Sequence, residues 1–389
     1  MLFSFLLVAA VAALVTAIAS FGVLRLSRRW QLAPELRERD VHTTPTPRLG
    51  GVAMFLGLLA AMIAATVFTD LVDRQGEAPR LWAIFGACSL IALVGILDDL
   101  LDLDWMLKLA AQLAAAGLLA WQGVQIVSVP FGNTLIVASP ALNFVLTVFL
   151  MTLVMNAVNF VDGLDGLVAG VAIIANAVFF IYTQLLAAET GGDASITFAA
   201  LMAATVVGMA VGFLPFNWHR ARMFMGDTGA LLIGLLMAVS TVSVTGQLNP
   251  GSLDQKLVLA SYIPIILPIA VLAMPLADFT LAVLRRLRAG KSPFSADRRH
   301  LHHRLLDMGH SPVQAVFIFY LWTAMISAAC LLVFTTQSFF WPAVVAATGG
   351  VLCLVVTLTP AVRVRRWLTQ RGLLRLTRSE NTADERIAK

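Results

Sequence analysis

The stretch GALLIGLLMAVSTVSVTGQ, residues 229–247, contains no charged side chain and is long enough to cross a lipid bilayer as a helix. About 20 apolar residues, each rising about 1.5 Å, span the roughly 30 Å of hydrocarbon in a membrane. The apolar positions run on continuously, whereas a membrane β-strand would alternate apolar and polar residues. Because lipid satisfies no backbone hydrogen bonds, this stretch predicts an all-α, polytopic transmembrane helix bundle.

The whole chain has the same character. Its 389 residues are 59% hydrophobic and 13% charged, whereas a soluble domain carries about 25% charged residues. This composition excludes a water-soluble fold. The three cysteines, Cys88, Cys330 and Cys353, lie in apolar runs without the spacing of metal ligands. We therefore expect buried thiols with no redox role.

Apolar runs separated by polar interruptions predict about eleven spans. They cover residues 2–24, 49–69, 81–99, 107–123, 141–159, 167–187, 196–216, 229–247, 257–284, 312–335 and 339–361. The first run is followed by arginines and preceded by none, the reverse of a signal peptide, so we expect it to remain as an anchor. We expect one transmembrane catalytic domain over residues 1–361 and a basic cytoplasmic tail over residues 362–389, resting on anionic lipid.

The positive residues predict the orientation. With the N-terminus outside, all but three of the 27 Lys and Arg residues fall on the inner side; the exceptions are Arg74, Arg80 and Lys256. Cytoplasmic loops carry such an excess, which predicts a multi-pass protein of the cell membrane with a cytoplasmic C-terminus. The net charge of +5 then reflects topology rather than nucleic-acid binding. The same orientation collects the unusual Asp, Asn and His residues on the inner side, which indicates one cytoplasmic site.

An acidic pair, Asp98 and Asp99, ends the third predicted span in the run GILDDLLDLDW. A carboxylate at mid-bilayer costs roughly 2.5–3.5 kcal/mol, so the pair lies either at the interface, as a solvated helix end, or in a functional site. Oxygen ligands of this kind suit Mg²⁺ or phosphate handling. Lys108, about a turn into the next span, either reaches a phosphate from the same side or extends to the interface.

Two further inner loops contain clustered polar residues. The run NAVNFVDGLDGL, residues 156–167, interleaves Asn and Asp with glycines, which allow the backbone to approach a ligand closely. It is either a plain turn or a segment that binds a nucleoside. The run FNWHRARMFMGDTG, residues 216–229, places Asp227 near a helix N-terminus, where the helix dipole favours anions and metal–phosphate complexes. Phe224 either stacks on a base or packs in the core.

The loop PFSADRRHLHHRL, residues 293–305, sets three histidines among arginines. A zinc site is one interpretation, but it requires a further ligand and supporting carboxylates. The arginines favour binding of phosphate or pyrophosphate, with histidine able to donate protons near neutral pH. Together the loops offer acids for a divalent metal, cations for phosphates and a segment for a nucleoside, as phosphoryl transfer requires. A secondary transporter is the alternative, although its site would lie near mid-bilayer between repeats, and no internal repeat is visible.

At these residues the sequence resembles the polyprenyl-phosphate N-acetylhexosamine-1-phosphate transferases of the MraY-like superfamily. The motifs that carry the resemblance, in family order, are TPTPRLGG (44–51), the acidic pair at 98–99, NAVNFVDGLDGL, FMGDTG and HLHH. The HLHH spacing and the eleventh span resemble the WecA/TagO branch rather than the MraY branch. Arg48 stands where MraY-type sequences usually have Met, so the role of the first motif stays open.

The resemblance implies Mg²⁺ as the cofactor, with Mn²⁺ as an alternative, cytoplasmic catalysis, UDP-GlcNAc as the donor and a polyprenyl phosphate such as undecaprenyl or decaprenyl phosphate as the acceptor. The products would be a polyprenyl-diphospho-GlcNAc and UMP, the first membrane step of a cell-envelope polysaccharide or wall linker. The resemblance also implies roles for individual residues. The implied catalytic residues are Asp98, Asp99, Asp227, His302 and His303. The implied metal ligands are Asp227 and Asn159. The implied substrate-binding residues are Asn156, Asn159, Asp162, Gly163, Asp165, Phe224 and His300. The polar loops themselves add Asn217, Arg298 and Lys108 as candidate substrate-binding residues.

We expect a single displacement, in which the lipid phosphate attacks the sugar-bearing phosphorus of UDP-GlcNAc. The second pKa of a phosphate monoester lies near roughly 6, so the acceptor is already largely dianionic at pH 7 and needs no essential base. A double displacement through an aspartyl-phosphate is the alternative. The sequence leaves the division of roles between Asp98 and Asp99 open, as well as the exact sugar, the length of the polyprenol and the choice between monomer and homodimer.

Overall fold

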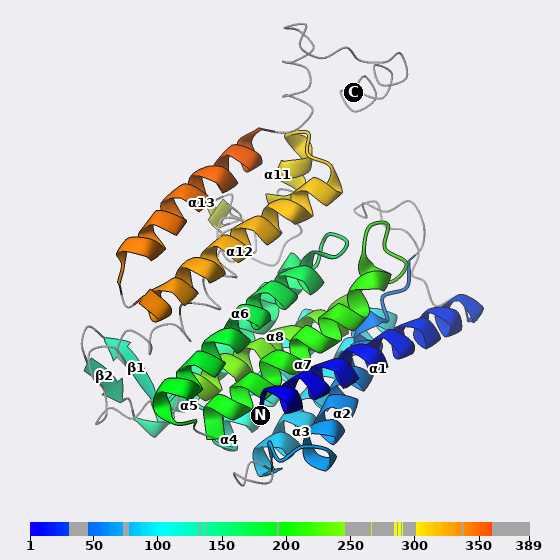
Figure 1. Cartoon of the computed structure of the whole chain (residues 1–389). Coiled ribbons are helices and arrows are strands. Elements are labelled where there is room, and N and C mark those ends of the chain that lie inside the picture. Colours follow the sequence, from blue (N-terminus) through cyan, green and yellow to red (C-terminus); the bar gives the residue numbers. More distant parts are fainter. Residues whose placement is uncertain are drawn as a thin grey trace, which may run out of the picture.

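A computed structural model describes residues 1–30, 46–72, 78–131, 134–137, 139–192, 194–245, 301–336 and 338–359, with a few isolated positions between 266 and 290. The described part is a bundle of long helices (Figure 1). The elements are α1 (Leu2–Arg29), α2 (Gly50–Val67), α3 (Ala78–Leu101), α4 (Trp105–Trp121), β1 (Ser128–Phe131), β2 (Thr134–Val137), α5 (Pro140–Val161), α6 (Leu167–Thr190), α7 (Ala194–Asn217), α8 (Gly226–Thr245), α11 (Leu301–Asp307), α12 (Pro312–Thr336) and α13 (Phe340–Leu358).

Nine helices of the described part are long and apolar enough to cross a membrane, and they coincide with nine of the predicted spans. A further predicted span, 107–123, is the shorter apolar helix α4. The predicted span 257–284 lies outside the described residues except at positions 266 and 284. The prediction of a multi-pass helical membrane protein is therefore confirmed. One feature was not predicted: a small antiparallel hairpin, β1 and β2, joins α4 to α5.

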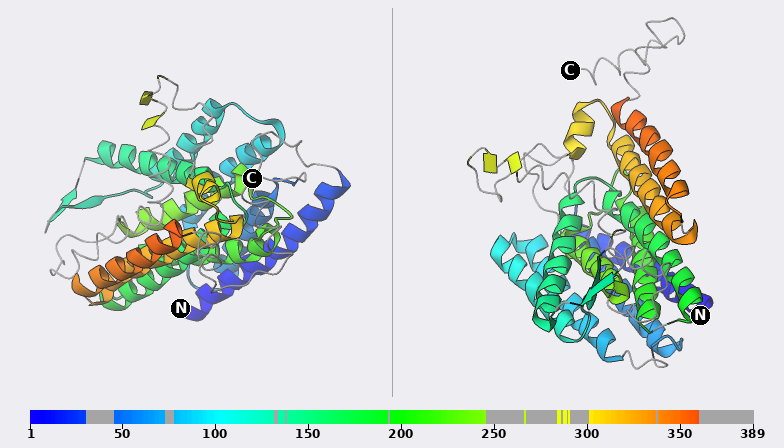
Figure 2. Two further views of the ribbon diagram at one scale, coloured as in Figure 1. Left: turned by 90° about the horizontal axis from the view of Figure 1, so that it is seen from above. Right: turned by 90° about the vertical axis from the view of Figure 1, so that its left-hand side faces the viewer.

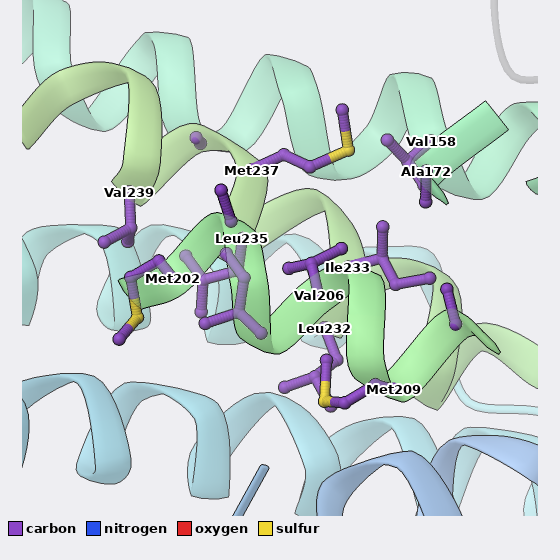
Figure 3. Close-up of a cluster of buried hydrophobic side chains, with 14 of the residues drawn as sticks. Val158, Ala172, Met202, Val206, Met209, Leu232, Ile233, Leu235, Met237 and Val239 are labelled. Atoms are coloured by element: carbon purple, nitrogen blue, oxygen red, sulfur yellow. The ribbon is translucent and has the colours of Figure 1, made fainter. Parts of the chain in front are cut away.

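Helices α7 and α8 form the centre of the bundle. In their most apolar windows 89% and 94% of the residues are buried, against 22% in α1 and 11% in α13. Figure 3 shows the interior between them, where Met202 and Val206 of α7 lie among Leu232, Ile233 and Leu235 of α8. The peripheral helices turn their apolar side chains outward, as lipid-facing helices do. The buried helices α7 and α8 therefore provide a rigid support for the loops at their ends.

Small residues let the helices approach closely. Gly208 and Gly212 of α7 lie one turn apart, and a Cβ at either glycine would come within 2.3 Å of a backbone carbonyl oxygen of α1, at Ala9 or Ala13. This is the Gly-x-x-x-Gly contact by which membrane helices pack backbone against backbone. On the other side, α12 packs along α6 and against α13 (Figures 1 and 2). A Cβ at Gly170 of α6 would overlap the Tyr320 ring of α12.

The helix order brings several loops to one end of the bundle. The C-terminal ends of α3, α5 and α7 and the N-terminal ends of α2, α4, α6 and α8 meet there. Bonds between these ends fix the arrangement: Asp99 to Asp227, Gly166 to Asn217, and Gly50 to Phe224. This end carries the polar loops identified in the sequence.

Candidate active site

A chain of charged contacts links α3, α4 and α8. The Lys108 ammonium lies 3.0 Å from Asp98 Oδ2 and 3.0 Å from Asp227 Oδ2. The Asp98 side chain is only 7% exposed, whereas that of Asp227 is 30% exposed. A second oxygen of Asp98 accepts a hydrogen bond from the Leu103 N–H at 2.9 Å. Asp227 is therefore the more accessible carboxylate, and Asp98 and Lys108 lie beside it.

Asp99 makes a different set of contacts. Its carboxylate accepts hydrogen bonds from the backbone N–H of Asp227 at 2.9 Å and of Thr228 at 3.3 Å, and from the Thr228 hydroxyl at 2.7 Å. The first N–H groups of a helix have no partner within the helix. Asp99, on the neighbouring helix α3, thus accepts hydrogen bonds from the unpaired N–H groups in the first turn of α8.

The first sequence motif lies against the same helix start. Phe224 N–H donates to Pro47 O at 2.8 Å, and the N–H groups of Gly50 and Gly51 donate to Phe224 O at 3.0 Å and Met225 O at 2.8 Å. The chain before α2 therefore pairs with the chain before α8. The structure gives this motif a definite contact, which the sequence had left open. The half-buried Phe224 is held at this junction.

The loop between α5 and α6 supplies an amide and a further acid. Asn159 lies within hydrogen-bonding reach of the Asp227 carboxylate. Asp162 follows directly after α5, where its N–H donates to Asn159 O at 3.2 Å. Burial and the negative charges of Asp227 and Asp99 raise the pKa of the Asp162 carboxyl to about 7, although Arg48 opposes the shift. Burial and the neighbouring acids both make the charged form of this carboxyl less favourable.

Three residues tie this loop to the loop before α8. Asn217 accepts a hydrogen bond from the Gly166 N–H at 2.9 Å and donates one to Met223 O at 3.1 Å. Asp165 accepts one from the Ala221 N–H at 3.0 Å and lies 3.3 Å from His219 Nδ1. Asn217 is 3% exposed, so in this structure its amide holds two loops together. Its contact with substrate stays a prediction, as does that of Asp165.

The remaining predicted residues are distributed as follows. Asn156, at the end of α5, donates to Gln112 of α4 and to Thr152 O at 2.8 Å. Gly163 is exposed at the tip of its turn. The structure describes the backbone of His302 and His303, which lies in α11, but not their side chains. Arg298 and His300 lie wholly outside the described residues, so their predicted roles stay predictions.

The sequence analysis missed three residues of this region. The Thr228 hydroxyl donates to the Asp99 carboxylate. The position of Thr228 next to Asp227 was the only sequence feature that could have indicated this contact. Gln112 lies four residues after Lys108, on the same face of α4, and a buried glutamine in an apolar helix could have indicated it. The Tyr320 hydroxyl donates to Gly166 O from α12. No feature of the sequence predicted the contact between Tyr320 and Gly166.

The oxygen ligands fit a magnesium ion. The Asp98 carboxyl and the Asn159 amide both lie within hydrogen-bonding reach of the Asp227 carboxylate. Magnesium is usually held by one or two carboxylates together with water and substrate phosphates. Among the described residues no group of three or more His, Cys, Asp and Glu side chains converges as a metal cage would.

Fold and site together define the class: a polytopic membrane protein that carries acids, an amide and a lysine at one end of its helix bundle. Residues 81–245 match the model of the family described as "Glycosyl transferase family 4". The chain is 38% identical over 363 residues to the decaprenyl-phosphate N-acetylglucosaminephosphotransferase of Mycolicibacterium smegmatis, a match that covers 92% of this chain and 88% of that one.

Two further relatives give the same picture. The decaprenyl-phosphate N-acetylglucosaminephosphotransferase of Mycobacterium leprae is 36% identical, over 94% of this chain and 91% of its own. The probable undecaprenyl-phosphate N-acetylglucosaminyl 1-phosphate transferase of Bacillus subtilis is 35% identical, over 73% of this chain and 72% of its own. The chain belongs to glycosyl transferase family 4.

Proposed function

We propose that this protein transfers N-acetylglucosamine-1-phosphate from UDP-GlcNAc to a polyprenyl phosphate and releases UMP. Two independent lines support the proposal. Relatives that align with most of the chain carry the names of polyprenyl-phosphate N-acetylglucosamine-1-phosphate transferases. The site also combines acids, an amide and a lysine at the end of membrane helices, where a lipid phosphate and a soluble nucleotide sugar can meet.

One observation carries most of the weight. Asp227 lies in the first turn of α8, is partly exposed, and is surrounded by Lys108, Asp98 and Asn159 from three other helices. Transfer between two phosphate groups requires neutralisation of their charge, and a helix N-terminus with oxygen ligands and a lysine provides it. A transporter site would lie near mid-bilayer, whereas these residues lie at helix ends.

The chemistry that fits is a single displacement. An oxygen of the lipid phosphate forms a bond to the sugar-bearing phosphorus, and the bond from that phosphorus to the UMP oxygen breaks. Magnesium, with Asp227, Asp98 and Asn159 as its protein ligands, would supply charge neutralisation at the diphosphate. Lys108 holds Asp98 and Asp227 together and can turn toward an incoming phosphate. The lipid phosphate needs no essential base, because its second pKa lies near roughly 6.

The orientation forms part of the proposal. By the predicted spans, all but three of the 27 Lys and Arg residues are assigned to the side that carries the site. The positive-inside rule therefore favours a cytoplasmic site and an N-terminus outside. A cytoplasmic site gives the soluble nucleotide sugar direct access. The helix ends around Asp227 lie next to the membrane boundary, where the phosphate of a membrane lipid is found.

The function can be tested with the purified protein in detergent. UDP-GlcNAc and a polyprenyl phosphate are expected to give UMP and a lipid diphosphosugar, with release stopped by a chelator and restored by Mg²⁺. A panel of UDP-sugars identifies the donor, and we expect UDP-GlcNAc to be used best. If no UDP-sugar releases UMP in the presence of lipid phosphate and Mg²⁺, the proposed function is wrong. Labelled phosphate trapped on the protein without acceptor would instead establish the double displacement.

A further inference from the structure

The two adjacent acids at the end of α3 have different surroundings. Asp98 contacts Lys108 and, through it, Asp227. Asp99 contacts the first turn of α8 through three hydrogen bonds, two from backbone N–H groups and one from the Thr228 hydroxyl. Successive helix residues point about 100° apart, so one acid faces α4 while the other faces α8. The DD pair is therefore two residues with separate partners.

The face of α3 that carries Asp99 is shaped to hold α8. Gly95 lies one turn before Asp99, and a Cβ at Gly95 would come within 2.5 Å of Thr228 Cα. Residues four apart share a helix face, so Gly95 permits the close approach that Asp99 then uses. On the α8 side, Gly226 permits the same close approach. Its φ is +71°, and a Cβ added there would lie 2.5 and 2.6 Å from the two Asp99 carboxylate oxygens. A side chain at position 226 would displace the Asp99 carboxylate.

We propose that Asp99, unlike its neighbour Asp98, is a positioning residue that acts through Asp227. The proposal rests on the function proposed above and divides the roles of the acidic pair. A carboxylate with its charge at a helix N-terminus satisfies N–H groups that lack partners and is favoured by the helix dipole. Asp99 uses about three of the roughly four lone-pair positions of a carboxylate in this way. The backbone N–H of Asp227 is one of these donors. Asp99 thereby fixes the Asp227 side chain beside Asn159 and Lys108.

The role predicts a coupling between Asp99 and Thr228 that neither a base nor a metal ligand at position 99 would produce. We would compare Asp99→Asn, Thr228→Val, the double variant and, as a matched control, Thr241→Val. Thr241 lies in the same helix and is buried, and its hydroxyl donates to Met237 O at 2.9 Å. The control therefore removes a buried hydroxyl from α8 without touching its start.

Two measurements report on the role without substrate turnover. The first is hydrogen exchange of the Asp227 and Thr228 amides, followed by mass spectrometry of peptides that cover residues 224–230. The second is binding of Mn²⁺ alone, followed by electron paramagnetic resonance. We expect Asp99→Asn and Thr228→Val each to speed exchange at these amides and to weaken Mn²⁺ binding about 2- to 30-fold, the range for loss of a helix cap. The loss of Mn²⁺ affinity in the double variant should be smaller than the product of the losses in the two single variants. Both single substitutions remove the same hydrogen bond, the one between Asp99 and the Thr228 hydroxyl.

Turnover supplies a third readout. With Asp99 in a positioning role, its variants need more Mg²⁺ for half-maximal rate while the shape of the pH–rate profile stays that of the wild type. Thr228→Ser retains the hydroxyl and should recover most of the Mn²⁺ affinity lost in Thr228→Val. This conservative variant also keeps the test valid if the valine variant proves unstable.

Two results would overturn the proposal. If Asp99→Asn lowers kcat more than about 100-fold with unchanged Mg²⁺ dependence and Thr228→Val behaves like the Thr241→Val control, Asp99 is a base. If Asp99→Asn abolishes Mn²⁺ binding without faster exchange at 227 and 228, Asp99 is a ligand. A wild-type protein that releases no UMP would refute the proposed function instead, and the exchange and Mn²⁺ results would remain interpretable without it.

Discussion

At the scale of single residues, charge decides the organisation of the site. Asp98 and Asp227 share one ammonium, and burial together with neighbouring acids raises the pKa of the Asp162 carboxyl. A cluster of acids with a single lysine between two of them binds cations well and repels a lone phosphate. Lys108 therefore stabilises the site before substrate arrives, and its ammonium could contact a phosphate afterwards.

Replacement of Asp227 by Asn tests the centre of the site. The amide keeps the size of the side chain but loses the charge that holds a metal and Lys108. We expect kcat to fall at least about 100-fold, the usual loss when one electrostatic contact to a transition state is removed, with unchanged elution in gel filtration. UMP release at saturating substrates measures the effect. An Asp227→Asn protein with near-normal turnover would remove Asp227 from the metal site.

Replacement of Lys108 by Met tests the charge balance. Without the ammonium, Asp98 and Asp227 repel each other, so the melting temperature without metal should fall. Mg²⁺ should then raise the melting temperature more than in the wild type, because a ligand that binds the folded state stabilises it. Differential scanning fluorimetry with and without Mg²⁺ measures both values, and Lys108→Arg is the control that keeps the charge. An equal Mg²⁺-induced shift in Lys108→Met and the wild type would contradict this account of Lys108.

At the scale of elements, small residues set how closely the helices pack. The contact of α7 with α1 depends on Gly208 and Gly212, which bring the backbones of the two helices together. Helix association in lipid relies on such packing because no hydrophobic force drives it. The same device serves the site, where Gly51 and Gly95 flank the start of α8. Glycines in the core and glycines in the site therefore have one physical role, which is close approach.

Gly212→Leu should separate α1 from α7. Overpacking of a tight interface costs roughly 1–3 kcal/mol, so the variant should melt at a lower temperature and give less monodisperse protein in detergent. The matched control is Val211→Leu, because Val211 is 46% exposed on the outer face of the same helix. Fluorescence-detected size exclusion after heating ranks the two variants. A Gly212→Leu protein as stable as Val211→Leu would show that the contact is not needed for stability.

At the scale of the whole molecule, alternating helices bring distant segments to one end. Residues from α2, α3, α4, α5 and α8 meet around Asp227, although they span positions 47 to 228 of the chain. The helices between these ends are mostly apolar and separate the two ends of the bundle. Polar residues can therefore gather at one boundary while the protein remains compatible with lipid.

The orientation can be measured with single cysteines. In a background without Cys88, Cys330 and Cys353, we would place a cysteine at exposed Asp307, before α12 on the side of the site, or at exposed Gln122, after α4 on the opposite side. A membrane-impermeant thiol reagent applied to intact cells should label Gln122→Cys and leave Asp307→Cys unlabelled until the membrane is opened. The reverse labelling pattern would place the site outside the cell and contradict the proposed orientation.

The sequence by itself determined the class of fold and the positions of the polar loops. Apolar length and charge distribution depend on local composition, so nine spans and the loops around Asp98, Asp162 and Asp227 could be predicted. The hairpin β1–β2 was not anticipated, because turn geometry leaves a weak local signal in the sequence.

Only the tertiary structure decided which polar groups face one another. The sequence presented Asp98 and Asp99 as one pair, and the packing of α3 between α4 and α8 separated them, one toward Lys108 and one toward Thr228. Asn217 and Tyr320, far apart in the chain, meet the same residue, Gly166. Such partners depend on helix rotation and crossing, which are fixed by contacts between residues far apart in sequence. Local pattern therefore gave the inventory of the site, and packing gave its connections.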